Sequence, residues 1–140
     1  MKYLKFFILL FLVTSCFDNS NKSRLVAFLK AFDKTLDDYK QIVIVNVDVC
    51  SSCDDVVRDF LYFNADRENL LIILSSHSRK KIDLIVGQND GINIIKDNEQ
   101  RALLEFDLVV DQPVLFTFFK DNIHKKTLRL NELQNAVNQL

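Results

Sequence analysis

The sequence predicts an α/β domain with a mixed central sheet, flanking helices and a C-terminal β-hairpin followed by a helix. Short, dense apolar runs rich in β-branched residues alternate with segments of helical periodicity along most of the chain. The 140 residues are 49% hydrophobic and include only two glycines and one proline. These features favour one folded domain with a real core.

The charge pattern excludes one class of partner. The formal net charge is −1 and both signs are interspersed along the chain, so there is no basic stripe of the kind that binds nucleic acid. We therefore expect no nucleic-acid partner.

The first half of the domain is predicted to alternate between helix and strand. Ser23 is a candidate N-cap for an amphipathic helix, and residues 42–47 form a nearly unbroken run typical of a strand covered on both faces. Residues 56–63 predict a helix, and residues 70–74 a second buried strand. Because such a β-α-β unit has a right-handed crossover, the two strands should be parallel and end at the same edge.

The second half is predicted to end in a hairpin. Residues 79–86 and 99–106 favour short helices, and residues 91–95 a short strand between them. Residues 114–119 predict another strand, followed by turn residues and a partner strand over residues 123–130. Asn131 with Gln134 resembles a capping box for the last helix.

The first 15 residues predict a lipoprotein signal peptide. Two lysines precede an apolar run over residues 6–13, which is shorter than the roughly 20 residues that a helix needs to cross a bilayer. Val13-Thr14-Ser15-Cys16 resembles the lipobox of bacterial lipoproteins, which implies cleavage before Cys16 and its modification with acyl chains such as palmitate. The alternative is an ordinary secretory peptide cleaved near Ser15, which would leave a spare thiol.

Lipidation of Cys16 gives the predicted domain organisation. Residues 1–15 are the signal peptide, residues 16–23 a lipidated tether and residues 24–140 the folded domain. We expect a lipid-anchored protein of the bacterial cell envelope, on the periplasmic or surface face. Phe17 does not decide between the inner and the outer membrane.

The remaining cysteines, Cys50 and Cys53, form a C-x-x-C motif between a predicted strand and a predicted helix. The helix N-terminus stabilises a thiolate, so Cys50 is the candidate nucleophile and Cys53 the residue that resolves a mixed disulfide. Ser51 and Ser52 are candidates for tuning the thiolate by hydrogen bonds.

Three acidic residues flank this motif: Asp48, Asp54 and Asp55, whereas the nearest base in sequence is Arg58. Negative neighbours raise a thiol pKa, so only a modest net lowering is expected. This favours a reductant or isomerase over a strong oxidant.

From Gln41 to Leu140 the sequence resembles the thioredoxin-like superfamily, and in particular its membrane-tethered branch of thiol–disulfide oxidoreductases. The strand that leads into the C-x-x-C motif, the order of the later elements, and Gln112-Pro113 before a dense apolar strand carry the resemblance. It implies a three-layer fold, with protein thiols or disulfides outside the cytoplasm as partners and no cofactor.

The resemblance also implies a site around the proline. A cis Gln112–Pro113 bond would face the dithiol, and both residues would dock the partner's backbone. The segment 91–110 looks like the family's insertion before that proline. Val49 departs from the family because an aromatic residue usually stands there, and Ile44 and Val56 stand where the family often keeps a buried acid.

Several alternatives stay open. The two cysteines could form a structural disulfide in a protein-binding module, or bind copper(I) together with a histidine. His77 is expected at the dithiol edge and His124 near the hairpin turn, whereas a zinc site would need two more ligands, so no metal is assigned.

Two further groups of residues are assigned structural roles. The basic clusters 79–81 and 125–126 are interpreted as solvated surface. Core positions, and no ligand site, are predicted for the phenylalanines at 28, 32, 60, 63, 106, 116, 118 and 119.

Overall fold

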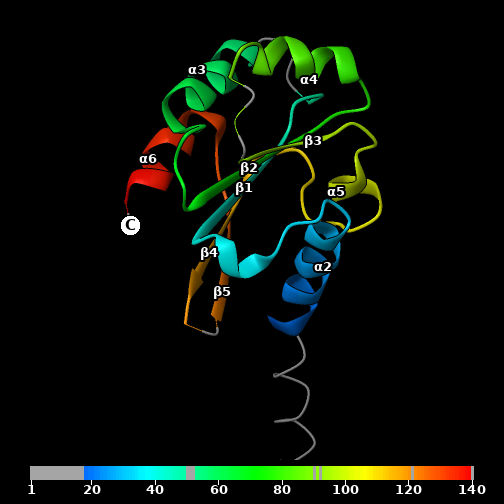
Figure 1. Ribbon diagram of the computed structural model, residues 1–140, viewed down its shortest axis with the longest axis vertical. Coiled ribbons are helices and arrows are strands. Elements are labelled where there is room, and N and C mark those ends of the chain that lie inside the picture. Colours follow the sequence, from blue (N-terminus) through cyan, green and yellow to red (C-terminus); the bar gives the residue numbers. More distant parts are fainter. Residues whose placement is uncertain (1–17, 50–52, 90, 92, 121, 140) are drawn as a thin grey trace, which may run out of the picture.

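A five-stranded mixed sheet lies between two layers of helices (Figure 1). The computed structural model describes residues 18–49, 53–89, 91, 93–120 and 122–139. The α/β class with a mixed central sheet and flanking helices is therefore confirmed. The elements are α2 (Asp18–Lys30), η1 (Leu36–Asp38), β1 (Gln41–Asn46), α3 (Asp54–Asn64), β2 (Leu70–Ser75), α4 (Arg79–Val86), β3 (Ile94–Asp97), α5 (Arg101–Leu104), β4 (Val114–Phe119), β5 (Asn122–Thr127), η2 (Leu130–Glu132) and α6 (Leu133–Asn138).

The strand order is β3-β2-β1-β4-β5. β1 pairs in parallel with β2, and β2 with β3, so the predicted parallel pairing of β1 and β2 is confirmed. β4 runs antiparallel to β1, with Val114 opposite Ile44, and β5 runs antiparallel to β4 as the predicted hairpin. The carboxyl ends of the parallel strands and the start of β4 therefore meet at one edge of the sheet.

Both faces of the sheet are buried. Val43 and Val45 of β1 face a core that α3, α4 and α6 cover, whereas Ile42 and Ile44 face a second core under α2 and α5. Every residue of β2 is buried. This accounts for the unbroken apolar runs, because a strand covered on both faces has no polar side.

The predicted helix boundaries need two corrections. α2 begins at Asp18, so Ser23 is not the N-cap but lies inside the helix and donates a hydrogen bond to the Ser20 carbonyl at 3.1 Å. The Asn131 capping box is also wrong. The Glu132 carboxylate accepts a hydrogen bond from the Arg129 backbone N–H at 3.0 Å, because the chain turns through η2 before α6 begins.

Two of the phenylalanines predicted to be core are on the surface. Phe63 and Phe119 are each 68% exposed, whereas Phe28 and Phe116 are fully buried. α3 buries residues 57, 60, 61 and 64, which follow the i, i+3, i+4, i+7 pattern of one helix face. Phe63 lies outside that stripe, so a large aromatic side chain is left in solvent.

None of the helices in the described part of the chain has both the length and the apolar composition needed to cross a bilayer.

Asp97, at the end of the edge strand β3, is fully buried. One carboxylate oxygen accepts a hydrogen bond from the Arg101 N–H at 2.9 Å. The other accepts from the Ala102 N–H at 2.8 Å and from the Ser75 hydroxyl at 2.9 Å. This carboxylate therefore joins β2, β3 and the start of α5.

We expect Asp97→Ala to lower the free energy of unfolding by about 2–4 kcal/mol, because it leaves two buried donors and one partly buried donor without an acceptor. Urea denaturation measures the change. Asp66→Ala, at an exposed position, is the control and should change stability by less than about 0.5 kcal/mol. Equal effects of the two variants would contradict this role for Asp97.

Candidate functional site

Cys53 is the N-cap of α3 and is partly exposed. Its carbonyl accepts a hydrogen bond from the Val57 N–H at 3.1 Å, and its sulfur is disulfide-bonded. Cys50, Ser51, Ser52 and Cys16 lie outside the described residues, so the pairing of Cys53 with Cys50 and the roles of both serines stay predictions.

The structure brings Cys53 together with the predicted docking residues Gln112 and Pro113. All three line a cavity of about 160 Å³ at the edge where β1 ends and β4 begins. Pro113 is buried and Gln112 is exposed, while Val49 and Leu130 form apolar parts of the wall. β4 runs antiparallel to β1, so it starts beside the end of β1. This pairing brings Gln112 and Pro113 close to Cys53.

The expected cis peptide bond is wrong. No peptide bond between described residues is cis, so Gln112–Pro113 is trans. The cis isomer was implied only by the family resemblance, whereas the trans form of an X–Pro bond is intrinsically favoured by about 0.5–1 kcal/mol. The Pro113 carbonyl accepts a hydrogen bond from the Leu128 N–H at 2.8 Å, which holds the start of β4 against the end of the hairpin.

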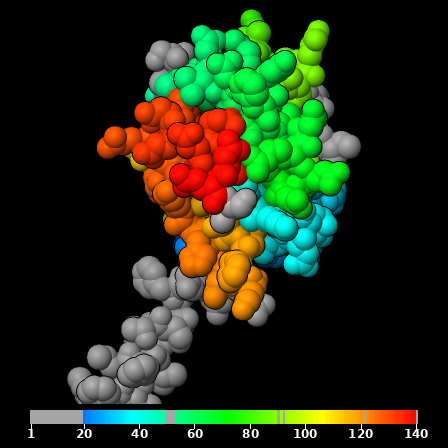
Figure 2. Space-filling model, turned by 90° about the vertical axis from the view of Figure 1, so that its left-hand side faces the viewer, coloured from blue at the N-terminus to red at the C-terminus, as the bar shows by residue number. Residues whose placement is uncertain are grey.

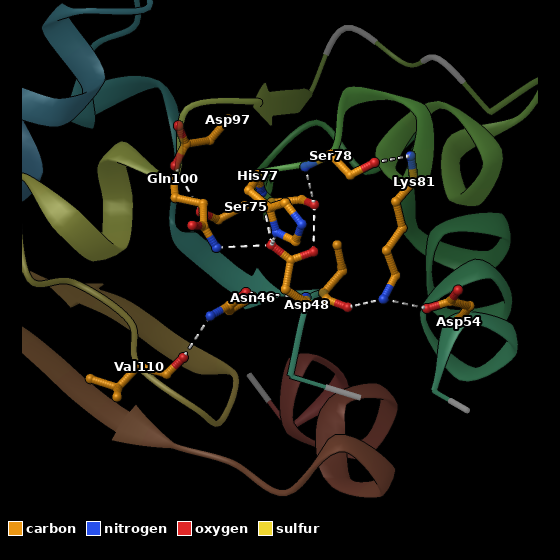
Figure 3. A network of polar contacts seen from close by, with 12 residues as sticks. Asn46, Asp48, Asp54, Ser75, His77, Ser78, Lys81, Asp97, Gln100 and Val110 are labelled. Carbon is orange, nitrogen blue, oxygen red and sulfur yellow. Dashed lines mark hydrogen bonds and ion pairs between the residues drawn. The ribbon is translucent and has the colours of Figure 1, made fainter. Parts of the chain in front are cut away.

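Asp48, two residues after the end of β1, is the centre of a polar network at the same sheet edge (Figure 3). Its carboxylate accepts hydrogen bonds from the Ser76 hydroxyl at 2.6 Å and the His77 backbone N–H at 2.8 Å. It also contacts the His77 ring Nδ1 at 2.6 Å and accepts from the Gln100 amide at 2.9 Å. The chain leaving β1 is therefore held to the end of β2 and to the residue before α5.

The network changes the acidity of Asp48. Burial by itself raises the pKa of this carboxyl, but the hydrogen bonds from Ser76 and His77 and the charge of His77 outweigh it. The pKa of Asp48 therefore lies below its usual range. The side chain is only 14% exposed, so the ionised form is stabilised by protein donors more than by water.

The acids flanking the motif are compensated by cations. The Lys81 ammonium, from α4, lies 3.5 Å from the Asp54 carboxylate and donates a hydrogen bond to the Val47 carbonyl. Arg58 pairs with Asp55 at 2.7 Å. The negative charge around the motif is therefore compensated more than the order of residues along the chain predicts. The reason is that Lys81 is close to Asp54 in space although it is distant along the chain.

Lys81 is a residue of the candidate site that the sequence analysis missed. Its cluster was interpreted as solvated surface, which is wrong for Lys81 because this side chain is only 22% exposed. The interpretation is confirmed for Arg79, which is 81% exposed, and for Lys125 and Lys126. No local pattern distinguishes Lys81 from Arg79, because only the packing of α4 beside α3 decides which side chain turns inward.

The two histidines lie apart. His77 follows β2 at the dithiol edge, as predicted, and its side chain is 75% exposed. His124 is on β5, opposite Thr117. Within the described ranges, no group of three or more His, Cys, Asp and Glu side chains is arranged to hold a metal ion.

Comparison with known proteins gave no relative. No protein-family model matches the sequence, and neither a curated protein nor a solved structure gives a significant match.

We expect the Asp48 network to make stability depend on acid pH. A carboxyl whose folded-state pKa is lowered adds stability above its unfolded pKa of about 3.9 and loses it as the pH falls through the folded value. Asp48→Asn should therefore cost about 1–3 kcal/mol at neutral pH. This difference from the wild type should hold down to about pH 4 and close below it.

Urea denaturation at a series of pH values measures this difference. Glu68→Gln, at an exposed position, is the control and should follow the wild-type curve. A difference for Asp48→Asn that does not shrink in acid would contradict the assignment.

Proposed function

We propose that this protein is a thioredoxin-like thiol–disulfide oxidoreductase that works outside the cytoplasm. The observation that carries the proposal is the position of Cys53, a partly exposed, disulfide-bonded residue at the start of α3 that shares a cavity with Gln112 and Pro113. A cysteine at a helix start is positioned for thiolate chemistry, and the cavity gives a partner access to it.

The topology supports the finer fold assignment. A β-α-β unit with the C-x-x-C motif after its first strand is followed by an antiparallel hairpin and a final helix. Helices cover both faces of the sheet, as in a three-layer fold. This is the arrangement that the resemblance implies, with β3, from the predicted insertion, as the outer parallel strand.

The exchange proceeds in two balanced steps. The Cys50 thiolate attacks one sulfur of a partner disulfide, which forms a mixed disulfide and releases the partner's other sulfur as a thiolate. The Cys53 thiolate then attacks the Cys50 sulfur, which closes the internal disulfide and releases the second partner thiol. Two electrons pass from the dithiol to the partner, and the reverse sequence oxidises a partner dithiol.

The charges favour a reductant or isomerase over a strong oxidant. A strong oxidant needs a strongly stabilised thiolate in its reduced form. Lys81 compensates the Asp54 carboxylate and hydrogen-bonds to Val47, while Arg58 compensates Asp55. These cations are thus engaged with other groups, and the helix start remains the main source of thiolate stabilisation.

We expect Cys53→Ser to trap covalent complexes with partner proteins, because the mixed disulfide on Cys50 can no longer be resolved. Non-reducing gels of membrane extracts measure the trapped species. Cys50→Ser is the matched control and should trap none, because it lacks the attacking sulfur. Failure of Cys53→Ser to trap any partner would favour a structural disulfide in a non-catalytic binding module.

The location is part of the proposal. Residues 1–15 resemble a signal peptide and Cys16 the acylated cysteine of a lipoprotein, and the first described residue of α2, Asp18, comes two positions after Cys16. A lipid on Cys16 would therefore hold the folded domain close to the membrane, since two extended residues span only about 7 Å.

We expect metabolic labelling with a radioactive fatty acid to mark the wild-type protein and to be lost in Cys16→Ser. The variant should also leave the membrane fraction, because acyl chains supply the proposed anchorage. Cys53→Ser should keep the label and is the control. Labelling of Cys16→Ser equal to wild type would contradict the lipid assignment.

A further inference from the structure

A second cavity adjoins the one that contains Cys53. It measures about 190 Å³ and is lined by Val56, Phe60 and Phe63 of α3 on one side and by residues of η2 and α6 on the other. Leu130 lines both cavities. The two hollows share this side chain and are together named the α3–η2 groove; their linings on the α3 side include Cys53 at one end and Phe63 at the other.

The walls of the α3–η2 groove are fixed to each other. The Asn64 side-chain amide donates to the Phe60 carbonyl at 2.8 Å and to the Gln134 side-chain oxygen at 2.7 Å. Arg67, just beyond α3, donates to the Val137 carbonyl at 3.1 Å. The contacts to Gln134 and Val137 therefore hold α6 against the C-terminal end of α3. Figure 2 shows the face of the molecule that carries α6, in red.

Several apolar side chains that line the groove are exposed to solvent. Val49 is 48% exposed, Val56 is 43% exposed and Phe63 is 68% exposed, and each lines one of the two cavities. Buried Phe60 and Leu133 form apolar parts of its wall. Exposed apolar side chains that line a hollow mark an interaction site more often than they serve stability.

The charges along the groove are mainly acidic. Asp111 and Asp54 line the first cavity and Asp59 the second, against one basic side chain, Arg129. Lys81 compensates Asp54. Asp59 and Asp111 are exposed, and among the described residues neither has an ion-pair partner. An apolar groove with exposed acidic side chains in its lining complements a ligand that combines an apolar side chain with a positive charge.

We propose that the α3–η2 groove docks an extended segment of the partner protein, whose apolar and basic side chains lie to one side of its reactive cysteine. This inference rests on the proposed function and adds the class of substrate. Cys53 and Phe63 are ten helical residues apart, a distance of about 15 Å. An extended chain covers this distance in four or five residues, which gives the approximate spacing between the apolar anchor and the part of the partner that lies beside Cys53.

The test measures docking separately from redox chemistry. The probe is a short fluorescent peptide with serine in place of cysteine, and with phenylalanine and lysine about four residues away. Fluorescence anisotropy with the oxidised full-length protein gives its Kd. We expect Phe63→Ser to raise that Kd about tenfold, since part of the burial of a phenylalanine is worth roughly 1.4 kcal/mol.

The chain offers a matched control. Tyr62 is 69% exposed and its ring meets that of Phe63 edge-on, but it lines neither cavity. Tyr62→Ser should therefore leave the Kd unchanged. Asp59→Asn should weaken binding of the lysine peptide and leave binding of a peptide with glutamine in place of lysine unaltered.

Kinetics separate this inference from the proposed function. With a cysteine-containing form of the peptide as a disulfide substrate, Phe63→Ser should raise KM, and its rate with glutathione disulfide should stay at the wild-type level. Absence of any reaction with glutathione disulfide would overturn the proposed function. The anisotropy measurement would still show whether the groove binds the peptide.

Three results would overturn the groove proposal. They are an unchanged Kd in Phe63→Ser, an equal loss of binding in Tyr62→Ser, and a Phe63→Ser variant that alters only the oligomeric state in light scattering. The last result would assign the groove to a second copy of this chain.

Discussion

The central position of β1 is the constraint on which the rest of the structure depends. β1 is paired with β2 on one side and with β4 on the other, and apolar cores cover both of its faces. Because the first pairing is parallel and the second antiparallel, the end of β1, the end of β2 and the start of β4 share one edge of the sheet. Cys53, Asp48 and Pro113 therefore meet there, although they are separated along the chain.

The polar contacts at this edge hold the described residues that flank the C-x-x-C motif. Asp48 is bound by Ser76, His77 and Gln100, and the Lys81 ammonium joins the Val47 carbonyl to the Asp54 carboxylate. Side chains from the segment after β2, from α4 and from the residue before α5 make these contacts. The same contacts remove much of the negative potential that three neighbouring acids would otherwise create, because each charge has a donor or a cation within reach.

In the proposed function, exchange and recognition of the partner take place on neighbouring parts of one surface. The cavity beside Cys53 and the adjoining cavity along α3 share Leu130, and the second has an apolar wall that includes Phe63. An exposed phenylalanine adds little to folding when it remains in solvent, whereas its burial by a docked chain releases hydration free energy. The trans Gln112–Pro113 bond differs from the cis bond that the family resemblance implied.

The sequence alone determined the class of fold, most of its elements and the candidate redox pair. Dense β-branched runs, helical periodicity and the turn at residues 120–122 are local patterns, and they predicted β1, α3, β2, α4 and the β4–β5 hairpin closely. The local patterns misplaced Phe63 and Lys81, because burial depends on which face of a helix the neighbouring helices cover. Only the tertiary structure decided the isomer of Gln112–Pro113, the pairing of Lys81 with Asp54 and the groove beside Cys53. Each of these depends on contacts between segments far apart in the chain, which no local pattern records.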